Sequence, residues 1–434
     1  MFKQVNTVSF DEAVKVIKTN DRIHIHSVAC APQGLIKAMC ERGRRKEFSN
    51  VRIQHLHTEG PAPYADAEFE GIFVLESFFV GGNVRKQTQA GYADYIPVHL
   101  NETQKLIRDN VLPVDVVLLQ VCPPDKHGYV SLGTSVDCTL AAVQNAKTVI
   151  AVINPNMPRA WGDAVIKADM IDIFCEDDSP LIEAHASVLS DIDIAIGKNC
   201  ANLIEDGATL QMGIGAIPNA VLAQLGNHKN LGIHTEMFAD GVLPLYESGV
   251  INNSQKPLDT GKIVSTFLMG SKEVYDFIDD NPAVAMMDVG YTNNPYVISQ
   301  LPKMTAINSA LSIDLTGQVN ADSLGCKYYS GCGGQLDFIR GAAMSKGGKP
   351  IIAMPSVTGK GMSKIASTLM CGAGVVTTRF DIHYFVTEHG AVDLYGKTLQ
   401  DRAKALISVA HPDHQEELDK AAFERFGSHF HFKK

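Results

Sequence analysis

The sequence predicts an α/β protein made of two similar open domains, each with a mostly parallel sheet. The first observation is length, because 434 residues exceed what one ordinary core organises. The second is that short apolar runs typical of buried strands alternate with helical stretches along the whole chain. The third is that a strand, turn and helix near the start return, in the same order, in the second half. Together these patterns indicate one architecture used twice.

The repeated unit is an apolar strand followed by a turn with proline and then a helix. In the first half residues 21–28 lead into Ala31-Pro-Gln33, and in the second half residues 208–213 lead into Ile217-Pro-Asn219. Such loose periodicity is suggestive of a repeat. It predicts that equivalent loops stand at equivalent places in the two domains.

The next strand of each half ends in the same three residues, His57-Thr-Glu59 and His234-Thr-Glu236. We expect domains at residues 1–188 and 189–434, with the boundary near residues 184–190 and the active site in the cleft between the domains. A helix is expected at residues 193–204. Further strands are predicted at residues 72–75, 114–119, 148–153, 262–267, 284–287, 310–314, 350–354 and 384–387.

Composition and charge exclude several classes of protein. Hydrophobic content of 45% and charged content of 20% are those of a soluble globular protein. A net charge of −10 argues against general affinity for nucleic acid or an anionic membrane, because both need a basic surface. The sequence contains no long apolar run, and residues 1–6 lack a secretory signal pattern. We therefore expect a cytoplasmic protein.

The nine cysteines are scattered and never form a Cys-x-x-Cys pair, so we expect small buried residues or free thiols. The histidines show no spacing typical of metal ligands. The His-x-Glu pairs lack the Pro-Cys-x-x-Cys partner of a zinc deaminase. No metal site is predicted.

The most informative segment is the turn Gly213-Ile-Gly-Ala-Ile-Pro218 together with Glu236. The glycines allow backbone N–H groups to approach an anion closely. Glu236 would stand at the carboxyl edge of a parallel sheet, where ligands bind in open α/β folds. A dinucleotide fold has a similar pattern, but Pro218 occupies the place of its third glycine. Both interpretations remain open on these residues alone.

Other loops combine glycine with polar residues. Ser330-Gly-Cys-Gly-Gly-Gln335 is the densest glycine loop in the chain and could pack against an extended ligand. Lys346-Gly-Gly-Lys349 could contact phosphate or be a solvated turn. Glu388 and His389 could form an acid and base pair, although a structural role is favoured because adjacent strand residues point to opposite faces.

Taken in order, these motifs resemble the acetyl-CoA hydrolase/transferase family of CoA-transferases. The motifs that carry the resemblance are Gly213-Ile-Gly-Ala-Ile-Pro-Asn-Ala220, His234-Thr-Glu-Met237, Ser330-Gly-Cys-Gly-Gly-Gln-Leu-Asp-Phe338, Thr377-Thr-Arg379, Thr387-Glu-His-Gly390, Gln120-Val-Cys-Pro-Pro-Asp-Lys-His-Gly-Tyr-Val-Ser-Leu-Gly133 and Met157-Pro-Arg159. They cover nearly the whole chain. The shorter length and the residues around Glu236 are most similar to the 4-hydroxybutyrate and butyrate branch.

The resemblance implies roles for particular residues. Glu236 would be the catalytic glutamate that carries acyl and CoA groups in turn. Coenzyme A would be a substrate, with no permanently bound cofactor, and a short-chain carboxylate would be the other partner. The family likeness also implies a homodimer or higher homo-oligomer. The implied CoA-binding residues are Gly213, Ile214, Gly215, Ala216, Ile217, Gly333, Gly334 and Lys346.

The leading hypothesis is an acyl-CoA:carboxylate CoA-transferase that works by a ping-pong mechanism through a glutamyl-CoA thioester. An acyl-CoA hydrolase would use the same site and let water intercept the intermediate. An NAD-dependent oxidoreductase and a noncatalytic sensor of CoA esters are the more distant alternatives. Sequence does not decide the preferred acid, the direction of flux or the balance between transfer and hydrolysis.

Overall fold

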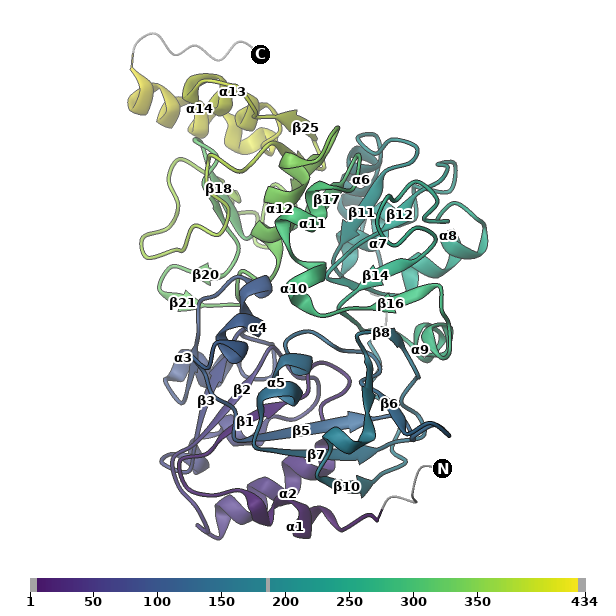
Figure 1. Ribbon diagram of the computed structural model, residues 1–434. Coiled ribbons are helices and arrows are strands. Elements are labelled where there is room, and N and C mark those ends of the chain that lie inside the picture. Colours follow the sequence, from purple (N-terminus) through teal and green to yellow (C-terminus); the bar gives the residue numbers. More distant parts are fainter. Residues whose placement is uncertain (1–5, 185–187, 428–434) are drawn as a thin grey trace. The chain divides into compact units, whose positions relative to one another are not determined.

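The computed structural model describes residues 6–184 and 188–427, which fold into two compact units (Figure 1). The first unit contains the described residues before 185 together with residues 262–293. The second contains the described residues from 188 to 261 and from 294 onward. The expected boundary near residues 184–190 falls partly on residues 185–187, outside the described part of the chain. The sequence predicts two domains that follow one another along the chain, whereas residues 262–293 lie in its second half and belong to the first unit.

The first unit is built on a sheet of seven strands, all paired in parallel, in the order β10-β7-β5-β1-β2-β3-β4. The chain adds β2, β3 and β4 on one side of β1 and then places β5, β7 and β10 on the other. The strand order therefore reverses between β1 and β5. The strands are β1 Arg22–Ile25, β2 Val51–His55, β3 Phe73–Ser77, β4 Ala93–Tyr95, β5 Val116–Val121, β7 Thr148–Ile153 and β10 Ile173–Glu176.

Helices cover both faces of this sheet (Figure 1). On one face α1 (Phe10–Ala13) and α2 (Gln33–Arg44) bury Ile23 and Ile25 of β1 in a large apolar cluster. On the other face α5 (Thr139–Asn145) contacts β1, because its Thr139 lies against His24. The other helix of eight or more residues in this unit is α4 (Leu100–Arg108). A sheet covered on both faces explains why its strands β5 and β7 read as nearly continuous apolar runs.

The second unit repeats this plan in a six-stranded sheet with the order β12-β11-β17-β22-β24-β25. All its strand pairs are parallel except β24 with β25. The strand order reverses between β11 and β17, as it does between β1 and β5 in the first unit. The predicted internal echo is therefore a repeated topology. The strands are β11 Thr209–Met212, β12 Gly232–Ile233, β17 Thr305–Asn308, β22 Lys349–Ala353, β24 Tyr384–Thr387 and β25 Gly390–Asp393.

The helices of the second unit pack on its sheet through their apolar faces. α6 (Asp191–Ala201) begins in a capping box of Ser190 with Asp193, and lies beside α7 (Ala216–Leu222). α12 (Gln335–Met344) buries Phe338 against Ala306 of β17. The other helices of eight or more residues are α13 (Leu399–Ser408) and α14 (Pro412–Phe426).

Shorter elements complete both units. In the first unit they are η1 Val14–Val16, η2 Pro63–Ala65, η3 Ala67–Phe69, α3 Arg85–Ala90, β6 Tyr129–Ser131, β8 Trp161–Gly162, β9 Val165–Lys167, η4 Ala168–Met170, β14 Ile263–Ser265, β15 Phe267–Leu268, α9 Lys272–Ile278, β16 Val284–Met286 and α10 Val289–Thr292. In the second they are β13 Met237–Phe238, η5 Asp240–Val242, α8 Leu243–Glu247, α11 Pro295–Ser299, β18 Ser312–Asp314, β19 Val319–Asn320, β20 Ser323–Leu324, β21 Lys327–Tyr328 and β23 Ile365–Ala366.

Each predicted strand overlaps a strand of the structure, but three of them lie in a smaller sheet or in the other unit. The strand expected at residues 310–314 is β18, which belongs to a small three-stranded sheet, whereas β17 at Thr305–Asn308 joins the main sheet. Both segments are short and largely buried, so local pattern does not tell which one joins the main sheet. The strands expected at residues 262–267 and 284–287 do form, but they belong to the first unit.

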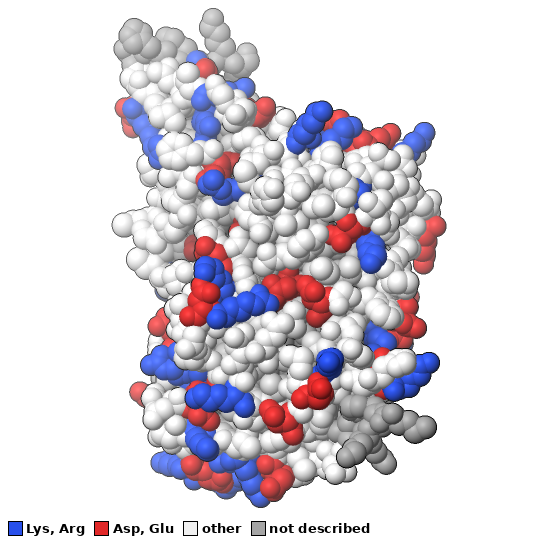
Figure 2. Space-filling model, viewed as in Figure 1, with Lys and Arg blue, Asp and Glu red and all other residues white. Residues whose placement is uncertain are grey.

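The surface carries both acidic and basic residues (Figure 2), as the composition of 48 acidic and 38 basic residues leads one to expect. Figure 2 shows acidic and basic side chains interspersed on the visible face. Among the described residues, no helix combines the length and the apolar character needed to cross a membrane. The nine cysteines are all free thiols, and six of them are buried.

Close packing of α6 on α7 yields a prediction about stability. A Cβ atom added at Gly197 of α6 would lie 2.6 Å from the backbone carbon and oxygen of Ala220 in α7. Backbone atoms cannot move aside as a flexible side chain does. We expect Gly197→Ala to lower the free energy of unfolding by about 1–3 kcal/mol in chemical denaturation, despite the better helix propensity of alanine.

Gly226→Ala is the matched control, because Gly226 is exposed and a Cβ there would meet nothing within 4 Å. Its free energy of unfolding should stay within about 0.5 kcal/mol of the parent. Equal stability of the two variants would contradict the packing described for Gly197.

Candidate functional site

The glycine turn of the second unit leaves the carboxyl end of β11. Gly215 is the N-cap of α7 and has a φ of 113°, a conformation that glycine adopts readily. A Cβ at Gly213 or at Gly215 would meet nothing within 4 Å, so the turn borders open space. Within the described part of the chain, the backbone N–H groups of residues 213–217 donate to no protein acceptor. The turn therefore offers a row of backbone donors to a ligand.

The side chains of the turn divide into anchors and exposed groups. Ile217 is buried and fixes the start of α7, whereas Ile214 is exposed and Ala216 is half-buried. Ile217 therefore anchors the start of α7, while the rest of the turn stays accessible.

Glu236 follows β12, the strand next to β11, and its side chain is half-buried. The preceding residue, Thr235, ties the two strand ends together. Its hydroxyl lies 2.9 Å from the carbonyl oxygen of Met212 and accepts the Met212 N–H at 3.3 Å. A small cavity of about 10 Å³ is lined by both Gly213 and Thr235. The glycine turn and the glutamate segment are therefore neighbours at the carboxyl edge of the sheet.

The glycine-rich loop at residues 330–334 reaches the same edge. Gly333 has a φ of 50° and Gly334 is the N-cap of α12. Burial, followed by the negative charges of Asp337 and Glu236, raises the pKa of the Cys332 thiol to about 12. The effect of a charge on a neighbouring pKa weakens with distance, so Glu236 and Cys332 belong to the same region of the second unit.

Side-chain amides form hydrogen bonds at the glycine-rich loop and at the neighbouring strand ends. The side-chain amide of Gln335 donates to the backbone oxygen of Ser309 at 2.7 Å, and its oxygen accepts from the hydroxyl of Thr377 at 3.1 Å. Gln211 and Asn308 exchange side-chain hydrogen bonds between β11 and β17, the shorter of 3.0 Å. Several sequence motifs that are far apart along the chain thus meet at one edge.

Lys346 lies elsewhere. It is exposed, it follows the last turn of α12, and its carbonyl oxygen accepts the N–H of Lys303 at 2.8 Å. The ten residues of α12 separate it from Gly334, a rise of about 15 Å along the helix axis. The structure does not bring Lys346 to the edge that carries Glu236. Its role in binding CoA rests on the resemblance alone and stays a prediction.

Glu388 has a structural partner. Its carboxylate accepts the N–H of Ser356, which follows β22, at 2.9 Å, and it also accepts the Ser356 hydroxyl. His389 lies 3.5 Å from the same carboxylate. Glu388 therefore has the structural role that the sequence favoured, but the reason differs, because residues 388 and 389 form the turn between β24 and β25 and their side chains lie together.

The first unit carries an equivalent edge with different chemistry. Glu59 follows β2, is half-buried, and burial raises its pKa. Gln33 at the start of α2 donates to the backbone oxygen of Glu59 at 2.9 Å. A cavity of about 680 Å³ is lined by Gln33 and Gln120, close to the point where strand order reverses. In the loop that follows β5, the Asp125 carboxylate accepts the backbone N–H groups of His127 and Tyr129, which is ordinary turn chemistry.

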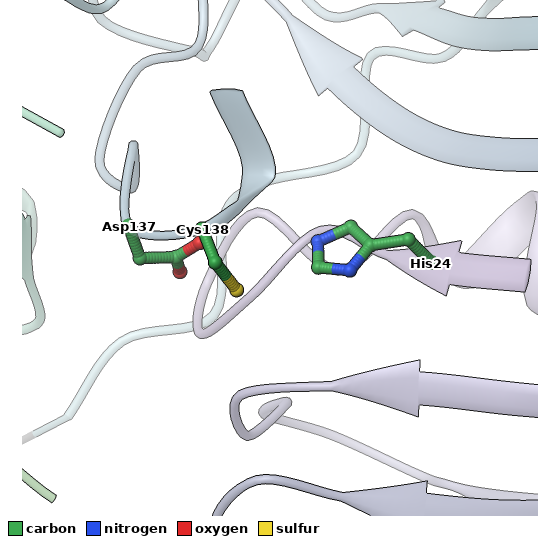
Figure 3. Close-up of side chains that lie close together, drawn as sticks. All are labelled: His24, Asp137 and Cys138. Atoms are coloured by element: carbon green, nitrogen blue, oxygen red, sulfur yellow. The ribbon is translucent and has the colours of Figure 1, made fainter. Parts of the chain in front are cut away.

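Three buried side chains of the first unit have the residue types of a metal site. His24, Asp137 and Cys138 place ligand atoms within 4.8 Å of one another (Figure 3). Asp137 already accepts from the Ser135 hydroxyl at 2.8 Å and the Thr139 N–H at 2.7 Å, and His24 lies 3.0 Å from the Thr139 hydroxyl. Burial raises the pKa of the Cys138 thiol, and a protonated thiol is a poor metal ligand. We interpret this cluster as a hydrogen-bonded network within the core.

Comparison with known proteins identifies the family. Residues 3–183 match the acetyl-CoA hydrolase/transferase N-terminal domain, and residues 270–422 match the C-terminal domain of the same name. A Fasciola hepatica protein named succinyl-CoA:acetate/propanoyl-CoA:succinate CoA transferase is 50% identical, over 96% of this chain and 87% of its own. A Clostridium kluyveri protein named 4-hydroxybutyrate coenzyme A transferase is 47% identical, over 96% of this chain and 97% of its own.

A solved structure agrees along the whole chain. RipA from Yersinia pestis is 35% identical, with a TM-score of 0.92 and 97% of each chain covered. The chain described here belongs to the acetyl-CoA hydrolase/transferase family, and it is an enzyme of the CoA-transferase class. Family membership favours the CoA interpretation of the Gly213 turn over the dinucleotide one.

Buried histidines make the first unit sensitive to acid. Burial lowers the pKa of His55 to about 3, and in the described structure neither of its ring nitrogens has a hydrogen-bond partner. The unfolded chain takes up a proton at this histidine below about pH 6.5, whereas the native state stays neutral. The unfolded state then binds more protons, so stability falls as pH drops from 6.5 toward 3.

We expect His55→Phe to remove this contribution while keeping a ring beside Tyr64, whose ring centre lies 5.9 Å away. Between pH 7 and pH 5 the parent should lose about 2 kcal/mol more unfolding free energy than the variant. Denaturant titrations at both pH values measure the difference. An equal loss in both proteins would rule out a buried neutral imidazole at this position.

Proposed function

We propose that this CoA-transferase moves CoA between a short-chain acyl-CoA and a free carboxylate, with Glu236 as the nucleophile. The observation that carries the proposal is the position of Glu236. Glu236 is half-buried and follows β12 at the carboxyl edge of a parallel sheet, the edge that also carries a turn with available backbone N–H groups and a glycine-rich loop. Open α/β sheets bind ligands at this edge, where the strand order reverses.

The chemistry uses two half-reactions on one carboxylate. The Glu236 carboxylate attacks the thioester carbonyl of the acyl-CoA, the carbon–sulfur bond breaks, and an acyl-glutamyl anhydride and CoA thiolate form. The thiolate then attacks the glutamyl carbonyl of the anhydride, which releases the first free carboxylate and leaves a glutamyl-CoA thioester. A second carboxylate reverses both steps and leaves as its CoA ester. Charge and atoms balance at each step without a redox or metal cofactor.

The backbone of the Gly213 turn would stabilise the oxyanion that forms at each attack. Preorganised N–H donors aimed at a developing negative charge contribute several kcal/mol to such reactions, and removing one typically costs about 100- to 1,000-fold in rate. We propose that residues 213–217, together with Gly333 and Gly334, bind CoA and orient the thioester. Glycine suits this role because the thioester has to approach the backbone closely.

The substrate class follows from the relatives and stays a proposal. The C. kluyveri relative is named for 4-hydroxybutyrate, and its 47% identity extends along nearly the whole chain. We propose 4-hydroxybutyrate, butyrate or acetate as the acid. The location of the acid in a cleft between the predicted domains, residence in the cytoplasm and assembly as a homo-oligomer remain predictions.

Hydrolysis is the second candidate, because the family name covers hydrolases as well as transferases. Both activities would use the same anhydride and thioester, and they differ only in whether water reaches them. Incubation of acetyl-CoA with labelled butyrate or 4-hydroxybutyrate separates them. Label should appear in a CoA ester, whereas release of free CoA at the same rate with and without the acid would support the hydrolase.

Glu236→Ala tests the nucleophile directly. We expect CoA transfer to fall by at least about 10⁴-fold, because the group that forms both covalent intermediates is absent. Binding of the CoA ester should change by less than about threefold, because the backbone turn remains. Exchange kinetics and calorimetric titration measure the two quantities.

The matched control is Glu59→Ala, because Glu59 ends the same His-Thr-Glu tripeptide in the first unit. This change should lower transfer by less than about tenfold. Near-normal turnover of Glu236→Ala, or an equally severe loss in Glu59→Ala, would remove the basis for assigning the nucleophile to the second unit.

A further inference from the structure

Strand β12 is an edge strand of two residues, and its outer side has no neighbouring strand in the sheet order. Its inner side pairs with β11. A free strand edge leaves backbone donors and acceptors that need other partners. In this sheet the edge matters because the strand continues directly into the segment that carries Glu236.

Two side chains complete the outer edge of β12. The side-chain oxygen of Asn253 accepts the backbone N–H of Ile233 at 2.8 Å. The ammonium of Lys256 donates to the backbone oxygen of the same residue at 2.9 Å. Both side chains are buried, so these bonds are shielded from water. Together they replace the pair of ladder bonds that a further strand would supply.

The Lys256 side chain also packs along the strand. A Cβ at Gly232 would lie 2.9 Å from its Cγ and Cδ atoms, so the aliphatic part of the lysine occupies the space beside that glycine. Asn253 is itself held by two backbone hydrogen bonds. Its N–H donates to the backbone oxygen of Leu231 at 3.1 Å, and its backbone oxygen accepts the N–H of Gly261 at 3.0 Å. The turn at residues 253–261 is therefore a rigid clamp on β12.

A buried lysine is an unusual choice for such a clamp. Lys256 is 2% exposed, and lysine is almost never fully buried unless it is paired. Burial lowers its pKa to about 7, with the charge of Asp259 acting in the opposite direction. The shift reflects the penalty for placing the charge there. An apolar side chain of similar length would fill the same space without that penalty, but it would leave the buried backbone oxygen of Ile233 without its donor, so the bond to β12 is what requires the ammonium.

We propose that Lys256, supported by Asn253, is a positioning residue that fixes the strand end carrying Glu236 at the geometry needed for attack on the thioester. It acts through Ile233, three residues before Glu236. On the opposite side Thr235 fixes the same segment to Met212. The inference rests on the proposed role of Glu236 and assigns no direct contact between Lys256 and substrate.

Lys256→Met tests the proposal because it keeps the length of the side chain and removes the donor. We expect kcat for CoA transfer to fall about 100-fold, since misplacing a reacting group by about 1 Å has an effect of that size. KM for acyl-CoA should change less than threefold. The melting temperature should change little, because removal of the buried charge offsets the loss of the donor to the Ile233 carbonyl oxygen.

The split between activity and stability distinguishes positioning from a structural role. If Lys256 only stabilised the fold, the variant would melt earlier and its remaining folded fraction would keep the parent kcat. The control is Lys229→Met, at an exposed lysine two residues before Leu231. Its kcat should stay within twofold of the parent.

A second readout does not depend on catalysis. Hydrogen–deuterium exchange of the peptide covering residues 231–237 should be at least tenfold faster in Lys256→Met and in Asn253→Leu than in the parent and in Lys229→Met. If the parent proves to have no transferase activity, this measurement still tests the clamp. Unchanged exchange in that peptide together with unchanged kcat would overturn the proposal.

Discussion

One hydroxyl joins two strand ends at the candidate site of the second unit. Thr235 bonds to the backbone of Met212 and thereby joins the end of β12 to the end of β11. This contact places a carboxylate beside a turn of glycines, although 23 residues separate Thr235 from Met212 in the chain. Because Glu236 follows Thr235 directly, the hydrogen bonds of Thr235 restrict where the glutamate can lie. The glycine-rich loop at residues 330–334 is then brought to the same place by α12.

The two units share a topology but differ in what they expose. In the first unit the residue that leaves the β1 end is Val28, which is buried with a φ of 46° and donates its N–H to the His57 carbonyl at 2.9 Å. Its backbone is therefore used within the protein. In the second unit Gly213 and Gly215 leave the backbone open to ligand. Similar folds can thus carry a structural corner in one copy and a reactive one in the other.

Sequence reasoning predicted the fold class and the family because both depend on local patterns of residues, whereas the site residues stay a prediction. Glycine spacing, the strand before it and the His-Thr-Glu tripeptide are readable from residue type. The pairing of β17 with β11, and the return of residues 262–293 to the first unit, depend on which apolar segments meet in space, and several segments qualify equally. Lys256 was missed because a lysine in a polar turn is typical of a solvated surface. Only the folded chain reveals its burial.

The central claim is that Glu236 becomes covalently bound to CoA during the reaction. The most direct measurement is mass spectrometry of the enzyme after incubation with acyl-CoA in the absence of an acceptor acid. The account predicts release of the free acid and retention of CoA on the peptide containing Glu236, with the adduct lost when acceptor is added and absent from Glu236→Ala. An actively transferring enzyme that carries no adduct under single-turnover conditions, and whose double-reciprocal plots intersect, would contradict it.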